Sequence, residues 1–172
     1  TAKSVARAKG EALAEQGIRV ITVPENRWSR VDIKSVSLLP NCLAKQAAKE
    51  AGAREAWFVD ANGFVTEGGS TNAWIVTADG VLVTRPAEFG ILRGITRTVT
   101  LKVAAKLGLK VEERAFTVDE AKHAREAFVT AATTLVMPVV AIDDAAIGNG
   151  APGSTALALR HAFHESTEMV AI

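Results

Sequence analysis

Two short hairpins in the middle of the chain constrain its fold more than any other feature. Apolar and polar residues alternate on both sides of Asn62-Gly63, and again on both sides of Asp79-Gly80. Asn-Gly and Asp-Gly are the pairs that two-residue hairpin turns prefer, because both positions tolerate positive φ. The region therefore predicts a meandering antiparallel sheet with strands over 55–60, 64–67, 73–77 and 81–84.

The segments on either side of the hairpins predict helices and further strands, which together indicate an α+β domain. No repeat or low-complexity linker interrupts the 172 residues, so we expect one domain. The additional strands are expected over 18–23, 110–116, 127–130 and 136–142. Helices are expected over 2–15, 39–51, 95–107, 117–124 and 154–166.

Local signals mark the ends and faces of these helices. Pro40 suits a first helical position, and Gly52 and Gly108 each end a helix. Thr117 and Glu120 match a capping box. Apolar residues recur every four positions and predict one buried stripe on each of two helices. The stripes are Leu39, Leu43, Ala47 and Ala51 on the first, and Ile95, Val99, Val103 and Leu107 on the second.

Composition excludes several classes of function. The formal charge of +1 gives no basic excess for nucleic acid. No apolar stretch approaches the roughly 20 residues needed to cross a bilayer, so no membrane partner is expected.

The lone Cys42 excludes an internal disulfide, favours the cytoplasm, and is expected to be a small buried hydrophobe. The three histidines lack metal-ligand spacing, so no metal site is expected. Trp28, Trp57 and Trp74 are expected in the core or an interface.

Four segments carry groups that could perform chemistry, and each also has a structural explanation. Lys34 follows Arg27 and Arg30, and nearby cations lower a lysine pKa, but the lysine could equally be solvated. The segment 65–72 joins a carboxylate, two glycines and small polar residues, and could be a polar connection. The segment 90–97 could bind an anion at a helix start or form a plain N-cap. The segment 128–134 could complete a phosphate cradle or form a turn.

Taken in order, these motifs resemble the fold-type IV pyridoxal-phosphate aminotransferases, and most closely the D-amino-acid aminotransferase branch. The resemblance runs from about Arg19 to the last helix. It implies a C-terminal, large cofactor-binding domain with a mixed or antiparallel sheet and packed helices. Residues 1–17 would form an interdomain helix, and the family's small N-terminal domain would be missing. The matching motifs are RWSRVDIKS, LLPNCLAKQAA, VTEGGSTN, ILRGITR, FVTAATT, MPVVAID and IGNG.

The resemblance assigns three central roles. Lys34 is expected to form the Schiff base with pyridoxal 5'-phosphate and to carry a proton between the substrate and the cofactor. Arg27 is expected near the ring oxygen of the cofactor. Glu67 is expected to bond the pyridine nitrogen and keep it protonated, so that the ring can accept electrons.

Further positions complete the expected cofactor site. Leu92 would pack on a face of the ring, and the helix start would hold the phosphate. Ala132 replaces a common phosphate-binding hydroxyl, so that either Thr133 or Thr130 would take over or the phosphate would be held more loosely. Leu39 replaces a tyrosine of the branched-chain enzymes, which favours the D-amino-acid branch. The remaining expected contacts are Ser70, Thr71 and Asn72 around cofactor and substrate, and Gly94, Ile95 and Thr96 at the phosphate.

The implied activity is exchange of an amino group between an amino acid, expected to be D-configured, and a 2-oxo acid. The expected assembly is a homodimer, and the expected partners are these small molecules. Two alternatives remain open, the first of which would use the same lysine and glutamate. One is an aminodeoxychorismate lyase or an (R)-amine transaminase of the same fold. The other is a truncated cofactor domain without turnover.

Overall fold

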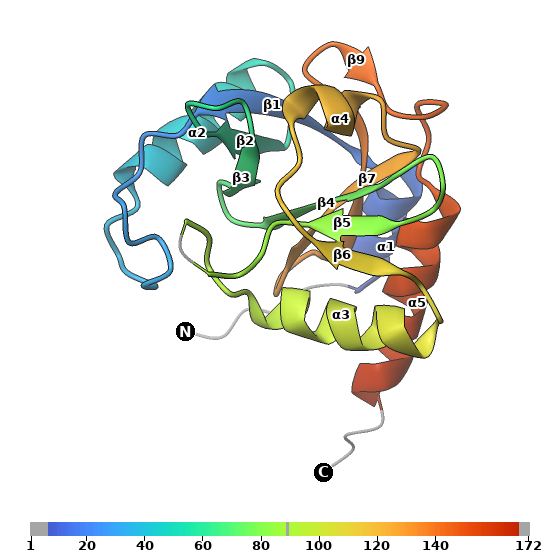
Figure 1. The fold of residues 1–172 in the computed structure, drawn as a ribbon. Helices are drawn as coiled ribbons and strands as arrows, with labels where there is room; N and C mark the ends of the chain where they lie inside the picture. Colours follow the sequence, from blue (N-terminus) through green and yellow to red (C-terminus); the bar gives the residue numbers. More distant parts are fainter. Residues whose placement is uncertain (1–6, 89, 169–172) are drawn as a thin grey trace.

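A mixed, curled sheet of nine strands forms the centre of the protein in the computed structural model, which describes residues 7–88 and 90–168 (Figure 1). The strands are β1 (Ile18–Pro24), β2 (Glu55–Val59), β3 (Val65–Gly68), β4 (Asn72–Val76), β5 (Leu82–Thr84), β6 (Val111–Glu113), β7 (Glu126–Ala131), β8 (Leu135–Ile142) and β9 (Ala145–Ala146). The helices are α1 (Arg7–Gln16), α2 (Leu39–Glu50), α3 (Ile95–Lys106), α4 (Val118–Lys122) and α5 (Ser154–Glu168).

Both expected hairpins are confirmed, but the expected meander is wrong. β2 pairs antiparallel with β3, and β4 pairs antiparallel with β5. In the sheet the two hairpins are separated by β1, β8 and β7, in the order β3-β2-β1-β8-β7-β4-β5-β6. β1 lies parallel to both β2 and β8. A tight turn determines only the pairing of the two strands that it joins, so the order of hairpins depends on long-range packing.

Two large apolar cores, together with a smaller cluster under α2, hold helices and sheet together in the described part of the chain. One lies within the curve of the sheet and includes Trp57, Val65 and Phe116. The other includes Trp74 and Phe128 on one face of β4 and β7, and Leu159 of α5. α3 and α5 cover this second core and lie against each other along the lower right of Figure 1. The segment between β1 and α2 contributes no residue to either of these cores.

α2 buries a different face from the one that its apolar repeat predicts. In α2 the buried residues are Ala44 and Ala48, while Leu39 and Leu43 are 69% and 58% exposed. Small side chains allow α2 to approach the sheet closely, where Phe58 packs on them.

The stripe expected on α3 is confirmed in part, because Val103 is buried and Val99 packs against the second core, whereas Leu107 is 44% exposed. Ile95 is 80% exposed, and the buried face carries Thr96, Thr100 and Val103. The hydroxyl of Thr100 donates to the carbonyl oxygen of Thr96, which makes a buried threonine acceptable inside the helix.

Other local predictions have mixed outcomes. Thr117 caps α4 by accepting a hydrogen bond from the Glu120 N–H, as the capping box predicts. Cys42 is exposed, so its expected burial is wrong; it lies on the outer face of α2 beside Leu43. Trp57 and Trp74 are fully buried, whereas Trp28 is half exposed. The first part of the helix expected over 2–15 lies outside the described residues. None of the described helices is long and apolar enough to span a membrane.

Candidate active site

A cleft of about 250 Å³ lies where the segment after β1 meets the start of α2 and the strand β3. Residues 25–38 of that segment form neither a strand nor a helix, so their side chains can line a cavity on the rim of the sheet. Four of the predicted site residues reach this one cleft from separate parts of the chain. They are Arg27, Lys34, Glu67 and Leu92.

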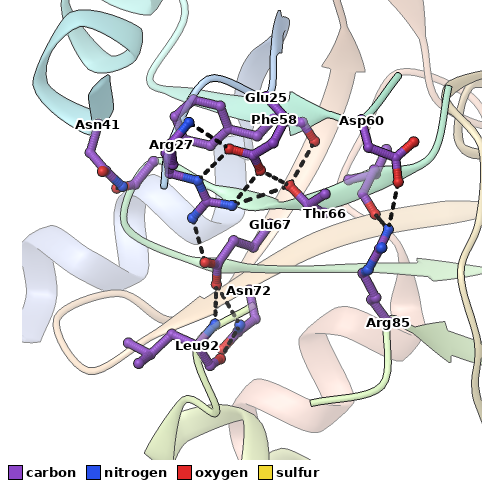
Figure 2. A network of polar contacts seen from close by, with 12 residues as sticks. Glu25, Arg27, Asn41, Phe58, Asp60, Thr66, Glu67, Asn72, Arg85 and Leu92 are labelled. Atoms are coloured by element: carbon purple, nitrogen blue, oxygen red, sulfur yellow. Dashed lines mark hydrogen bonds and ion pairs between the residues drawn. The ribbon is translucent and has the colours of Figure 1, made fainter. Parts of the chain in front are cut away.

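Glu67 is buried, with an exposed fraction of 5%. Its Oε1 lies 2.5 Å from Nη1 of Arg27. Its Oε2 accepts hydrogen bonds from the N–H of Leu92 and from Nδ2 of Asn72, both at 3.1 Å. Asn72 also donates to the carbonyl oxygen of Leu92, as Figure 2 shows. Glu67 is therefore held in one orientation from three directions.

Arg27 is fixed just as firmly by groups on its other side. Its Nε and Nη2 donate to the two carboxylate oxygens of Glu25 at 2.8 and 2.6 Å. The guanidinium carbon lies 4.4 Å from the centre of the Phe58 ring. Thr66 donates to Glu25 Oε2 at 2.7 Å (Figure 2). A bidentate pair of this kind fixes the plane of the guanidinium, so that Nη1 remains for Glu67.

Two carboxylates thus share one guanidinium, and their pKa values diverge. Burial raises the pKa of Glu67 to about 7, although Arg27 and the N–H of Leu92 favour its charged form. Burial acts in the same direction on Glu25, but hydrogen bonds from Arg27 and Thr66 outweigh it and leave the pKa of Glu25 below its ordinary value. Near neutral pH, Glu25 keeps its charge while Glu67 can gain or lose a proton.

Lys34 lies on the open side of the cleft. Its side chain is exposed, and none of the described residues forms a hydrogen bond or an ion pair with it. An amine in this position can reach a small molecule in the cleft without first breaking an interaction.

The start of α3 follows directly after Leu92. Gly94 is its N-cap with φ −65° and ψ 137°, and no side chain caps the helix. A Cβ on Gly94 would lie 2.2 Å from Oδ1 of Asn72, so a glycine is needed for this close approach. Free N–H groups and the helix dipole make such a start suitable for an anion. Ile95 and Thr96 form the first turn.

The structure places three other predicted residues in a second cavity of about 160 Å³. Ser70, Thr71 and Thr133 line it together with Glu55. Ser70 donates to Glu55 Oε2, and the buried hydroxyl of Thr71 has no hydrogen-bond partner within the described part of the chain. These three residues therefore do not line the cleft that holds Lys34 and Glu67.

The end of β7 and the turn that follows it carry the remaining predicted positions. Ala132 is exposed there and is not among the residues that line either cavity. Thr130, one of the two expected substitutes for the missing hydroxyl, is buried and accepts a hydrogen bond from Nε1 of Trp74 at 2.9 Å. Its hydroxyl is therefore already engaged, whereas Thr133 is exposed.

Sequence reasoning missed Glu25, Thr66 and Asn41. Glu25 precedes Arg27 by two residues, and in extended chain this spacing places two side chains on the same side. That pattern could have suggested the pair. Asn41 lines the cleft and donates to the carbonyl oxygen of Gly69, which follows from the packing of α2 and has no local signal.

The chain belongs to the class IV aminotransferases. The model of the family described as amino-transferase class IV matches residues 4–142, which is most of the chain. Solved members of the same class share the fold. A branched-chain amino acid aminotransferase from T.th., solved with pyridoxamine 5'-phosphate, is 34% identical, with a TM-score of 0.82 over 91% of this chain and 52% of that one.

Among curated relatives, the chain is similar to D-alanine aminotransferases. It is 43% identical over 145 residues to the Bacillus licheniformis enzyme, covering 84% of this chain and 50% of the relative. It is 40% identical over 155 residues to that of Staphylococcus aureus strain N315, covering 90% of this chain and 54% of the relative. The chain thus spans about half the length of the curated relatives that it matches.

Class IV aminotransferases use pyridoxal phosphate, and the groups in and beside the cleft fit this cofactor. Glu67 offers a buried carboxylate that can share a proton with a ring nitrogen. The start of α3 has no capping side chain and can receive a phosphate. Lys34 offers an amine that is unpaired within the described chain and can meet an aldehyde. The ring nitrogen, the phosphate and the aldehyde of the cofactor therefore each have a chemical counterpart here.

Proposed function

We propose that residues 1–172 are the cofactor-binding domain of an aminotransferase that exchanges an amino group between a D-amino acid and a 2-oxo acid. The observation that carries this proposal is the convergence of Lys34, Arg27, Glu67 and Leu92 on one cleft, within a chain of this family. A structural lysine or a structural ion pair would not require the amine and the buried carboxylate to face the same cavity.

Each residue of the cleft would have a separate role toward the cofactor. When bound, pyridoxal phosphate supplies an aldehyde that condenses with amines and a protonated ring that accepts electrons from the substrate carbon. Lys34 Nζ would hold the aldehyde carbon and, once released, move a proton to or from the substrate Cα. Glu67 would hold the proton at the ring nitrogen. The first N–H groups of α3 would bind the phosphate, and Leu92 would pack on the ring.

Reductive labelling tests the role of Lys34. The protein is incubated with pyridoxal phosphate, reduced with borohydride and digested, and the mass-shifted peptide is identified. We expect the adduct on Lys34 and none in Lys34→Ala. Lys45→Ala is the matched control, because Lys45 lies on α2, whose start borders the cleft, but pairs with Glu55 at 3.2 Å. An adduct confined to another lysine in the unmodified protein would refute the assignment.

The proposed preference for D-amino acids rests on two observations. The two curated relatives described above are named D-alanine aminotransferases, and Leu39 replaces the tyrosine expected of the branched-chain enzymes. A half-reaction followed by absorbance, with D-alanine and L-leucine offered separately, tests it. A faster change with D-alanine supports the proposal, and a faster change with L-leucine contradicts it.

A homodimer is proposed from the exposed apolar side chains near the cleft. Val36 is 96% exposed, and Leu39, Leu43 and Ile95 are also largely exposed. Exposed apolar side chains favour association, because a second surface that covers them removes them from water. Light scattering during size-exclusion chromatography measures the mass in solution: a mass of two chains supports the dimer, and a mass of one chain excludes it.

A further inference from the structure

Arg27 creates an electrostatic problem for the proposed role of Glu67. A carboxylate stabilises a protonated ring nitrogen because their charges are opposite. The Nη1 of Arg27 lies 2.5 Å from Oε1 of Glu67, so the formal charges of this pair sum to zero. A neutral pair attracts a cationic ring much more weakly than a lone carboxylate does.

Glu25 restores the missing charge. It binds the opposite edge of Arg27 through both carboxylate oxygens, and it also accepts a hydrogen bond from the backbone N–H of Arg27 at 3.1 Å. Thr66 donates to it as well. Glu25, Arg27 and Glu67 together carry a net charge of −1 when both carboxylates are ionised, and a protonated ring would bring the sum to zero.

Building on the proposed function, we infer that Glu25 is a positioning residue that acts on Glu67 through Arg27. It neutralises the guanidinium and holds it by one edge, so that Glu67 keeps the net negative charge needed to hold a proton at the ring nitrogen. Glu25 itself does not line the cleft, and so it acts through Arg27 rather than on the ligand.

The other charged groups near Glu25, Arg27 and Glu67 do not change the net charge of these three residues. Lys34 lines the same cleft, but its side chain is exposed, so that solvent screens its charge. Arg85 pairs with Asp60 at 3.2 Å on the far side of Thr66, and this pair is neutral as a unit (Figure 2). Glu25 is thus the group whose charge decides the sign of the network.

The proton affinity of Glu67 in the cofactor-free protein provides the test. It is measured from the carboxyl carbon signal of Glu67 in an NMR titration. Glu25→Gln removes the repulsion between the two carboxylates, and Glu67 is then the one carboxylate of the network that pairs with Arg27. We expect the proton affinity of Glu67 to fall at least about tenfold, since a unit charge at short range in a buried site contributes on the order of 1 to 2 kcal/mol.

Two further variants separate charge from structure. Glu25→Asp keeps the charge and should retain most of the proton affinity. Glu120→Gln is the matched control, because Glu120 also forms a two-point pair with an arginine, Arg114, but far from the cleft. It should leave the titration of Glu67 unchanged. If Glu25→Gln does not fold, Glu25→Ser removes the same charge and leaves room for water around Arg27.

A second readout uses the loaded protein. The absorbance of bound pyridoxal phosphate is followed against pH, and Glu25→Gln should lose the protonated-ring form at a lower pH than the unmodified protein.

An unchanged titration of Glu67 in the charge-removing variant, or an equal change in Glu120→Gln, overturns the inference. The NMR result does not depend on cofactor, whereas labelling of Lys34 does, so failure of the inference and failure of the proposed function are distinguishable.

Discussion

Removing the ionisable group of Glu67 should change how the stability of the protein depends on pH. The pKa of Glu67 is raised by burial from an ordinary 4.5 to about 7. The folded protein therefore binds a proton at this site that the unfolded chain releases between these two values. The resulting stabilisation is complete below pH 4.5 and is lost as the pH rises through 7.

The size of the effect follows from the pKa difference. Each pKa unit corresponds to about 1.4 kcal/mol, so the whole shift is equivalent to about 3 kcal/mol. Most of it falls between pH 5 and pH 8, where linkage gives about 2 to 3 kcal/mol for a single site with these two pKa values. Glu67→Gln resembles the protonated side chain and loses this contribution to the pH dependence. Arg27 keeps its pair with Glu25 in the variant, so that no buried charge is left alone.

Urea unfolding of the cofactor-free protein measures the effect. Trp57 and Trp74 are fully buried and report unfolding by their fluorescence. The unfolding free energy of Glu67→Gln, taken relative to that of the unmodified protein, should rise by about 2 to 3 kcal/mol from pH 5 to pH 8. Glu112→Gln is the control, because hydrogen bonds from Lys110 and Arg114 lower the pKa of Glu112 and keep it ionised throughout this range. Parallel pH profiles for Glu67→Gln and the unmodified protein would refute the reasoning.

Two further substitutions test how the site is supported. Gly94→Ala places a Cβ 2.2 Å from Asn72 Oδ1, so we expect a loss of about 1 to 3 kcal/mol in unfolding free energy and weaker binding of pyridoxal phosphate in a fluorescence titration. Gly10→Ala, whose Cβ would have ordinary contacts in α1, should not show this loss, and equal losses would contradict the steric argument. Arg160→Met removes a buried guanidinium that pairs with Glu11 and donates to two carbonyl oxygens, and should cost about 2 to 4 kcal/mol in urea unfolding. A loss below about 0.5 kcal/mol, the usual range of surface substitutions, would show that α5 does not depend on this residue.

Much of the local structure follows from short sequence signals. Asn62-Gly63 and Asp79-Gly80 produce the two expected hairpins, and Thr117 produces the expected cap. These features depend on φ preferences and hydrogen bonds within a few residues, which the sequence specifies directly. The order of the site motifs also sufficed to indicate the family, and the match over residues 4–142 confirms it.

The tertiary structure decided what depends on distant partners. It placed β1, β8 and β7 between the two hairpins, and it buried Ala44 and Ala48 of α2 instead of the larger leucines. No local pattern encodes these outcomes, because they depend on how closely separate elements can pack.

The candidate site divides in the same way. From the sequence alone, Lys34, Arg27 and Glu67 were predicted as its chemical groups, because their types and order suffice for a resemblance, and the three residues line one cleft. Only the fold brought Glu25 onto the far edge of Arg27 and placed Ser70 in a second cavity. The charge balance and the walls of a cavity depend on residues that are distant in the sequence and become neighbours in the fold. They are therefore determined only when the sheet curls and the segment after β1 packs against β3.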